Sequence, residues 1–369
     1  MRAKSNATAG SGVTVPFAAW GALGIVYVVW GSTYLGIKIS IETLPPLVST
    51  GIRFTGAAAL LLLAIALLKP RTLRVSRDQF GTAALSGLLL LVGGNGMVVL
   101  AEERISSGLA ALLVSTTPLW VVVLRTILGD RPALATIIGV GIGFGGVAIL
   151  LLPSGSGGLH GDLGHGVLVV GAALSWASGS LLSIRRPMPP NPFLGSVIQM
   201  FAGGSVLGAI GIGRGELRGF ALEQVSLRSW LALLYLMLAG SVVAFTAYIW
   251  VLGQLPVSTV TTYAYVNPVL AVFLGAVLLS EPVGPSVLLG GAVIVAAVAV
   301  VVTAEGRRRR ADRAAVAVQA RAVAGAPARV NGSARPGVNA PAVTALEHHS
   351  DSSELKAGAT DEEQTIRVV

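Results

Sequence analysis

Long apolar runs separated by short charged segments fill residues 17–304 of the chain. A helix needs about 20 apolar residues to cross a bilayer, and most of these runs reach that length without a charged residue. The run 229–280 has 52 residues, and Gly253, Gln254 and Pro256 divide it into two helices. The pattern predicts an all-α integral membrane protein with ten transmembrane helices, at 17–37, 47–68, 80–100, 105–125, 133–152, 164–184, 193–213, 229–251, 258–278 and 284–303.

Composition supports this interpretation and excludes other classes. The chain is 53% hydrophobic and only 12% charged, whereas soluble domains carry about a quarter charged residues. A soluble globular enzyme is therefore excluded. The absence of cysteine excludes disulfides, iron–sulfur clusters and thiol catalysis. Many of the 47 glycines lie inside the apolar runs, where small residues allow close helix contact in lipid.

The residues after the last apolar run differ in character. Residues 305–369 hold 18 of the 43 charged residues, are rich in Ala, Gly and Pro, and show no sustained apolar periodicity. Such a segment cannot bury enough apolar surface to fold. We therefore expect a disordered C-terminal tail at 305–369, with a short amphipathic helix at 311–325 on the inner leaflet as the alternative.

The two halves of the chain match one another at an offset of 146 to 150 residues. This defines two repeats, at 17–152 and 164–303, although apolar sequences also align by chance. Five spans is an odd number, so the second repeat is expected to insert upside down, as in many transporters with a mid-membrane substrate site. The matched pairs are Trp30 with Trp176, Ser32 with Ser178, Pro46 with Pro192, Pro118 with Pro268 and Gly141 with Gly291.

Several polar groups and two prolines fall inside the predicted spans, where they are costly and mark functional sites. Pro118 and Pro268 each remove a helix hydrogen bond and free a carbonyl, which is tolerated only where side chains, water or a ligand satisfy it. We therefore predict a central cavity with kinks or gates at these prolines; kinks that serve only packing are the alternative. The candidate substrate-binding residues are Trp30, Thr33, Tyr34, Asn95, Thr117, Trp176, Ser178, Tyr248, Tyr263, Tyr265 and Asn267.

Charged residues are almost absent from the span centres. Arg53 is the one full charge well inside, and it either contributes to the cavity or extends to the outer headgroups. Glu42, Glu102 and Glu103 are expected at the outer surface, which leaves no buried carboxylate to carry protons. Facilitated diffusion or exchange is therefore expected rather than proton-driven transport.

No enzyme chemistry is indicated by the motifs. The chain has no HExxH, no Walker loop, no paired intramembrane Asp and no Ser–His pair at depth. We therefore predict that it is not an enzyme and uses no cofactor or metal. The excess of Lys and Arg over Asp and Glu is explained by the positive-inside rule for membrane proteins. It does not indicate nucleic-acid binding.

A family resemblance joins these motifs. The string from Trp30 to Tyr34, followed by Pro45-Pro46 and Arg53-Phe54, resembles the first helix pair of the EamA drug/metabolite transporters. Similarity to its YedA-type branch lies in Asn95-Gly96-Met97, in the strings 101–103 and 107–112, and in the string from Ser258 to Asn267-Pro268. The resemblance covers about residues 17–303. It implies two inverted EamA units in the inner (plasma) membrane, a cavity built by helices 1, 3, 4, 6, 8 and 9, and secondary transport.

The function expected is export of a small organic metabolite, amino acid or drug, by alternating access of the two repeats. An uncharged, aromatic and hydroxyl-lined cavity suits zwitterions or moderately apolar neutral molecules. The alternative is a membrane sensor or scaffold that binds a partner through its cytoplasmic tail. Besides lipid and substrate, the chain is expected to act alone or as a homodimer.

The distribution of cations predicts the topology. With a cytoplasmic N-terminus, 15 Lys and Arg residues fall on the inner side and five on the outer side, which favours cytoplasmic N- and C-termini. Reporter fusions at Arg74, Gln224 and Arg310 should report inside, outside and inside. An outside signal at Arg310 would contradict the ten-span arrangement.

Overall fold

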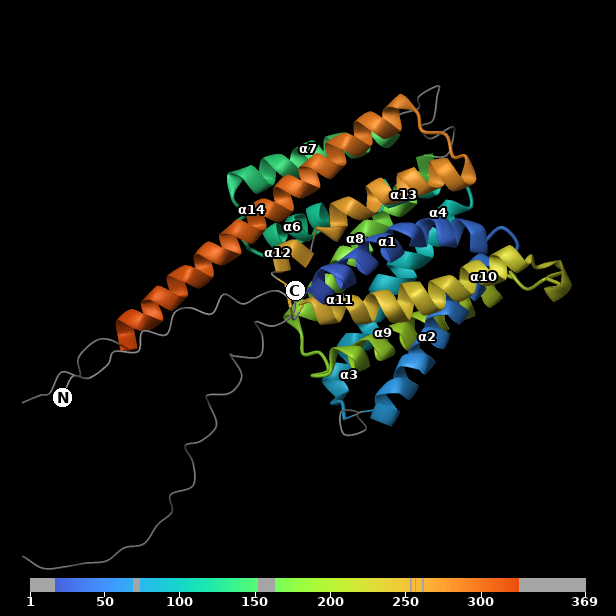
Figure 1. Ribbon diagram of the computed structural model, residues 1–369, viewed down its shortest axis with the longest axis horizontal. Coiled ribbons are helices and arrows are strands. Elements are labelled where there is room, and N and C mark those ends of the chain that lie inside the picture. The colour runs from blue at the N-terminus through green and yellow to red at the C-terminus, as the bar shows by residue number, and fades with distance from the viewer. Residues whose placement is uncertain are drawn as a thin grey trace, which may run out of the picture. The chain divides into compact units, whose positions relative to one another are not determined.

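The computed structural model describes residues 17–68, 74–151, 163–252, 254–255, 257–260 and 262–324. Within these residues every regular element is helical (Figure 1). The elements are α1 (Phe17–Ser40), α2 (Pro46–Leu68), α3 (Arg77–Gly87), η2 (Leu88–Gly96), α4 (Met97–Glu102), α5 (Ser107–Val114), α6 (Thr117–Ile127), α7 (Leu134–Leu151), α8 (Leu163–Arg185), α9 (Pro192–Gly213), η3 (Leu222–Gln224), α10 (Leu227–Tyr235), η4 (Leu236–Val243), α11 (Ala244–Leu252), α12 (Val257–Val260), α13 (Tyr263–Leu279) and α14 (Pro285–Ala324).

The prediction of an all-α membrane protein is confirmed. In the described part of the chain, nine helical runs are long and apolar enough to cross a membrane, and α13 is a shorter apolar helix. Four predicted spans are interrupted. Two of them contain π-helical segments, η2 and η4, and two are divided, into α5 with α6 and into α12 with α13.

The last helix extends beyond its predicted end. The sequence placed the end of this span at residue 303 and expected disorder from Glu305, but α14 continues as helix to Ala324. Its Ala-rich composition after the arginine run favours helix even without an apolar stripe. The rest of the predicted tail, 325–369, lies outside the described residues, as do Gly253 and Pro256.

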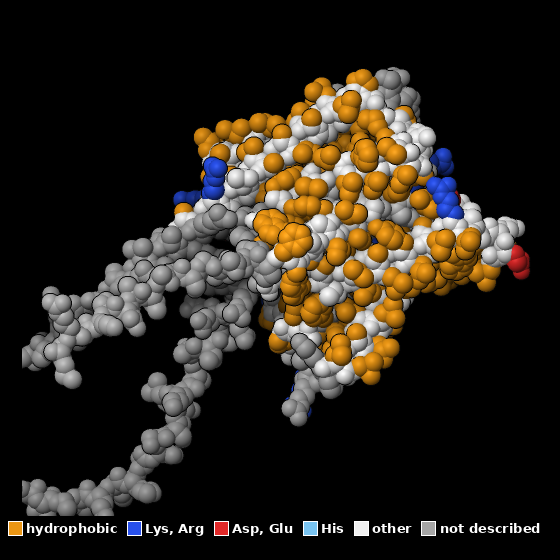
Figure 2. All heavy atoms as spheres, in the orientation of Figure 1, with side chains coloured by type: hydrophobic (Ala, Val, Ile, Leu, Met, Phe, Trp, Pro, Cys, Tyr) orange, Lys and Arg blue, Asp and Glu red, His pale blue; other side chains and the backbone are white. Residues whose placement is uncertain are grey.

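Apolar side chains cover the outside of the helices. Figure 2 shows hydrophobic side chains over most of the visible face, with Lys, Arg, Asp and Glu confined to a few places near its margins. Leu63, Ile138, Leu231 and Val277 are all more than half exposed. Exposing such a surface to water would be costly, whereas the hydrocarbon of a bilayer solvates it favourably.

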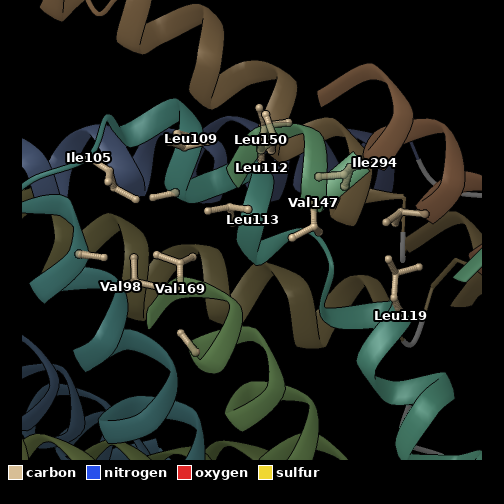
Figure 3. Packing of buried hydrophobic residues seen from close by; sticks show 14 of the residues in the cluster. Val98, Ile105, Leu109, Leu112, Leu113, Leu119, Val147, Leu150, Val169 and Ile294 are labelled. Atoms are coloured by element: carbon tan, nitrogen blue, oxygen red, sulfur yellow. The ribbon is translucent and has the colours of Figure 1, made fainter. Parts of the chain in front are cut away.

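The interior packs in two main clusters. One joins α5 with α4, α7, α8 and α14; Leu112, Leu113, Val147, Leu150 and Ile294 belong to it (Figure 3). The other joins α2, α3, η2 and α9. Both clusters bury leucine, isoleucine and valine side chains, so helices from both halves of the chain are held together by close apolar packing.

Two carboxylates stabilise helix N-termini across the two halves. Glu281 accepts hydrogen bonds from the amides of Ser107 (2.8 Å) and Gly108 (3.2 Å) at the start of α5. Glu216 accepts from the amides of Leu47 and Val48, each at 3.0 Å, at the start of α2. The first N–H groups of a helix have no partner inside it, and a carboxylate also matches the positive end of the helix dipole.

Helices α2 and α9 approach one another through glycine. A Cβ built on Gly204 would lie 2.9 Å from the backbone nitrogen of Thr55 in α2. One turn further along α9, a Cβ on Gly208 would meet nothing within 4 Å. The first position therefore requires glycine for contact, whereas the second has room for a methyl group.

These two glycines make a matched test of the packing. Gly204→Ala should lower the free energy of unfolding by about 1–3 kcal/mol, because it forces two backbones apart. Gly208→Ala should leave the stability unchanged or raise it slightly, since alanine favours helix. Thermal melting of the purified variants, followed by size-exclusion chromatography, measures both. Equal melting temperatures would contradict the described contact.

Candidate functional site

A cavity of about 410 Å³ lies among the helices, and side chains from both halves of the chain line it. They come from α1, α2, η2, α4, α5 and α6 in the first half and from α8, α9, η4, α11 and α13 in the second. The size is within the usual range for sites that bind small molecules. The cavity is therefore the candidate functional site.

Most residues singled out from the sequence lie around this cavity. Ser178 and Tyr265, although described, are not among the lining residues. Each is two positions from a lining residue, Trp176 or Tyr263, and a step of two turns the side chain about 200° around a helix. The lining residues that the sequence singled out are Trp30, Thr33, Tyr34, Arg53, Asn95, Thr117, Pro118, Trp176, Tyr248, Tyr263, Asn267 and Pro268.

The two π-helical segments contact the two tryptophans through glycine. A Cβ on Gly94 of η2 would lie 2.7 Å from the ring of Trp176. In η4, the carbonyl of Gly240 accepts a hydrogen bond from Trp30 Nε1 (3.2 Å). Trp30 and Trp176 are 146 residues apart, as are Gly94 and Gly240. Each tryptophan therefore contacts a glycine of the other half at equivalent repeat positions, by ring packing at Gly94 and by a hydrogen bond at Gly240.

Three aromatic rings pack together on one part of the lining. The ring centroids of Trp30 and Tyr248 are 5.0 Å apart, those of Trp30 and Tyr263 5.2 Å, and those of Tyr248 and Tyr263 5.7 Å. Both contacts of Tyr263 are edge-to-face, an arrangement that aromatic quadrupoles favour. We call Trp30, Tyr248 and Tyr263 the aromatic cluster; it gives the cavity a rigid apolar surface.

The two prolines act differently from one another. Pro268 lies inside α13, as expected. Pro118 instead lies in the first turn of α6, after the chain leaves the helix at Ser115 and Thr116. The carbonyl of Val114, expected to be free, accepts a hydrogen bond from Thr117 Oγ1 (2.7 Å). Proline is well suited to a first turn, where its missing N–H is not needed.

The sequence left the position of Arg53 open, and the structure places this residue at the cavity. Its side chain is buried, with 6% of the residue exposed. Nε donates to Ser241 Oγ (3.1 Å), and the guanidinium lies 4.7 Å from the centre of the Phe54 ring. Nη1 is buried without a hydrogen-bond partner among the described residues.

Glu102 is not at the outer surface, and that prediction is wrong. It is fully buried, and neither carboxylate oxygen has a hydrogen-bond partner in the part of the chain that the structure describes. Helix α4, which ends at Glu102, packs against α1, α2 and α8. Lys38 extends from α1 and donates to the backbone carbonyls of Glu102 and Ile105. Glu103, by contrast, is exposed.

Two lining residues that were not singled out from the sequence as site residues are repeat counterparts of residues that were, and Gln199 was already matched to Arg53 by the repeat. Ser241 lies 146 positions after Asn95, and Gln199 lies 146 positions after Arg53; all four line the cavity. Gln199 Nε2 donates to Ser86 Oγ (2.8 Å). The offset that revealed the repeat was therefore the signal that identifies them.

Comparison with known proteins gives the family. The model of the EamA-like transporter family matches residues 19–152 and again residues 165–303. The uncharacterized inner membrane transporter YedA of Escherichia coli strain K12 is 41% identical over 277 residues, which cover 75% of this chain and 88% of YedA. The uncharacterized transporter YoaV of Bacillus subtilis is 27% identical and covers 74% of this chain and 93% of its own length.

A further relative and a solved structure are also similar to this chain. A WAT1-related chloroplastic protein of Arabidopsis thaliana is 27% identical over 80% of this chain and 72% of its own. A solved crystal structure aligns with a TM-score of 0.52 at 21% identity, covering 77% of this chain and 97% of the other, and supports the fold. Two matches to the family model and the 41% identity to YedA show that this multi-pass membrane protein belongs to the EamA-like transporter family.

Proposed function

We propose that the chain exports a small organic solute, such as a metabolite, an amino acid or a drug, by alternating access. The observation that carries the proposal is one cavity lined by helices of both halves. Rocking of residues 17–152 against 164–303, as two inverted repeats, opens it to each side in turn. The proposal includes both termini on the cytoplasmic side of the inner membrane, because most Lys and Arg residues then lie on that side.

The interruptions of the helices support this mechanism. η2, η4, the break between α5 and α6 and the Pro268 position all contribute lining residues. Irregular backbone within a membrane is tolerated where it borders a cavity or is buried in protein. π-Helical turns and prolines are also points at which a helix bends. In the proposed mechanism, the segments on the two sides of each interruption therefore move separately, each with the helices that it packs against.

Asn267 is proposed to contact the substrate beside Pro268. The residue is 8% exposed, and its Oδ1 is buried without a hydrogen-bond partner among the described residues. An amide oxygen buried in this way is costly unless something bonds to it. The lining position gives a substrate hydroxyl or ammonium access to this acceptor.

The test of the proposed function is transport in proteoliposomes, with a panel of metabolites and drugs. For a transported solute that carries a hydroxyl or ammonium group, Asn267→Leu should lower the rate about tenfold or more, because one buried hydrogen bond is lost at nearly constant volume. Val269→Leu, on the exposed side of the same helix, should transport normally. Unchanged transport by Asn267→Leu would show that Asn267 does not contact the substrate, and no transport of any solute would contradict the proposed function.

Glu102 is proposed to link transport to protons, which revises the expectation of facilitated diffusion. A buried carboxylate without hydrogen bonds is costly when ionised, and proton uptake removes that cost. Helix α4 ends at Glu102, and Val98, one turn earlier on the same helix, lines the cavity. A change in the charge of Glu102 therefore occurs one helical turn from the site.

Adjacent glutamates allow a matched test of this link. In proteoliposomes with the membrane potential clamped, an imposed pH difference should drive uphill accumulation of the transported solute. Glu102→Gln should abolish the accumulation but retain exchange between equal solute pools, whereas Glu103→Gln, at an exposed position, should keep both. Accumulation that survives in Glu102→Gln, or that is absent from the unmodified protein, would show that Glu102 carries no proton.

A further inference from the structure

The cavity has a single formal charge among the described residues that line it. That charge is the guanidinium of Arg53; the other lining side chains are aromatic, aliphatic, hydroxyl or amide. A charge removed from water is costly unless it is paired and hydrogen-bonded. The cavity therefore contains a cationic group whose natural complement is an anion.

Contacts within the protein fix Arg53 but leave one of its donors free. Nε donates to Ser241 Oγ (3.1 Å) and the guanidinium packs on Phe54. Nη1 is buried and has no hydrogen-bond partner within the described ranges. A guanidinium is permanently charged, and its N–H groups match the geometry of a carboxylate. Arg53 is therefore oriented and has a donor available.

Neighbouring acidic residues do not use this donor. Both carboxylate oxygens of Glu102 are without hydrogen-bond partners among the described residues, and Glu102 does not line the cavity. The carboxylate of Glu281 is occupied by the amides of Ser107 and Gly108 and by the Ser107 hydroxyl. An anion that enters the cavity therefore meets Arg53 without competition from a carboxylate already bonded to it.

The π-helical segment η4 places the aromatic cluster next to this cation. The Gly240 carbonyl holds Trp30, and the next residue, Ser241, holds Arg53. A Cβ on Gly240 would lie 3.4 Å from Nη2 of Arg53 and 3.2 Å from Thr33, so glycine leaves space at this junction. Consecutive residues thus join an apolar, aromatic surface to an oriented positive charge.

We propose that the substrates are small monocarboxylates with an apolar or aromatic body, whose carboxylate binds Arg53 and whose body packs on the aromatic cluster. This proposal rests on the proposed transport function and narrows it to one chemical class. It differs from the neutral or zwitterionic solutes that the sequence favoured, because the sequence left open whether Arg53 faces the cavity. A strong polyanion is excluded by the single cation.

The test compares matched acids and amides, which differ in charge but hardly in shape. Binding of 3-phenylpropanoate and 3-phenylpropanamide, and of 4-phenylbutanoate and its amide, is measured by calorimetry on the full-length protein in nanodiscs of zwitterionic lipid. For at least one pair the acid should bind ten or more times more tightly than the amide. Equal binding of acid and amide, or binding of neither in both pairs, would overturn the proposal.

Variants connect the preference to Arg53. Arg53→Gln should reduce the acid-to-amide preference to less than threefold, and Arg53→Lys, which keeps the charge, should retain part of it. Arg228→Gln removes one positive charge at a half-exposed position far along the chain, where Arg228 lies 3.6 Å from Glu42, and should keep the full preference. A preference that persists in Arg53→Gln would overturn the assignment. If Arg53→Gln does not fold, the assignment is tested by comparing the acid-to-amide affinity ratio of the unmodified protein with that of Arg53→Lys. A ratio that is the same in both proteins would overturn the assignment.

The transport proposal is judged separately by the solute panel in proteoliposomes. If acid and amide bind equally and neutral solutes are transported, only the proposal that the substrates are carboxylates is wrong. Transport of no solute at all would contradict the proposed function itself.

Discussion

Every backbone N–H and C=O inside a bilayer must find a partner within the protein, and this constraint shapes the whole molecule. It explains why all regular elements in the described residues are helices, and why the interruptions of those helices are grouped. η2, η4 and the break between α5 and α6 all border one cavity. Where Pro118 would leave a carbonyl free, the hydroxyl of Thr117 bonds to it. Departures from regular helix thus mark the functional interior.

The fold could be predicted to a large extent from the sequence, because the length of the apolar runs and the positions of the charged residues between them indicate membrane helices. The repeat offset also paired Trp30 with Trp176, and both line the cavity, each in contact with a glycine of the other half of the chain. Side-chain direction was harder to predict. Ser178 and Tyr265 have the right chemistry and depth, yet a step of two residues turns them away from the lining.

Glu102 shows where prediction from sequence fails for a physical reason. Its position at the end of an apolar run indicates that it lies at the membrane surface. Whether a side chain at that depth is exposed, however, depends on whether neighbouring helices pack over it. Lys38 donates to the backbone carbonyls of Glu102 and Ile105, and the carboxylate of Glu102 is buried without a hydrogen-bond partner among the described residues. Such burial is a tertiary property that no local pattern records. The same holds for Arg53, whose direction was set by Ser241, a residue 188 positions away.

In the proposed mechanism, the cavity opens alternately to the two sides of the membrane. The chain has no cysteine, so single cysteines report accessibility directly. Ser180 lines the cavity, whereas Ser178, two residues away on α8, does not. A membrane-impermeant thiol reagent should label Ser180→Cys in both right-side-out and inside-out vesicles, and a transported solute should slow the reaction, while Ser178→Cys should stay unlabelled. Labelling of Ser180→Cys from one side only, or equal labelling of both variants, would contradict the account.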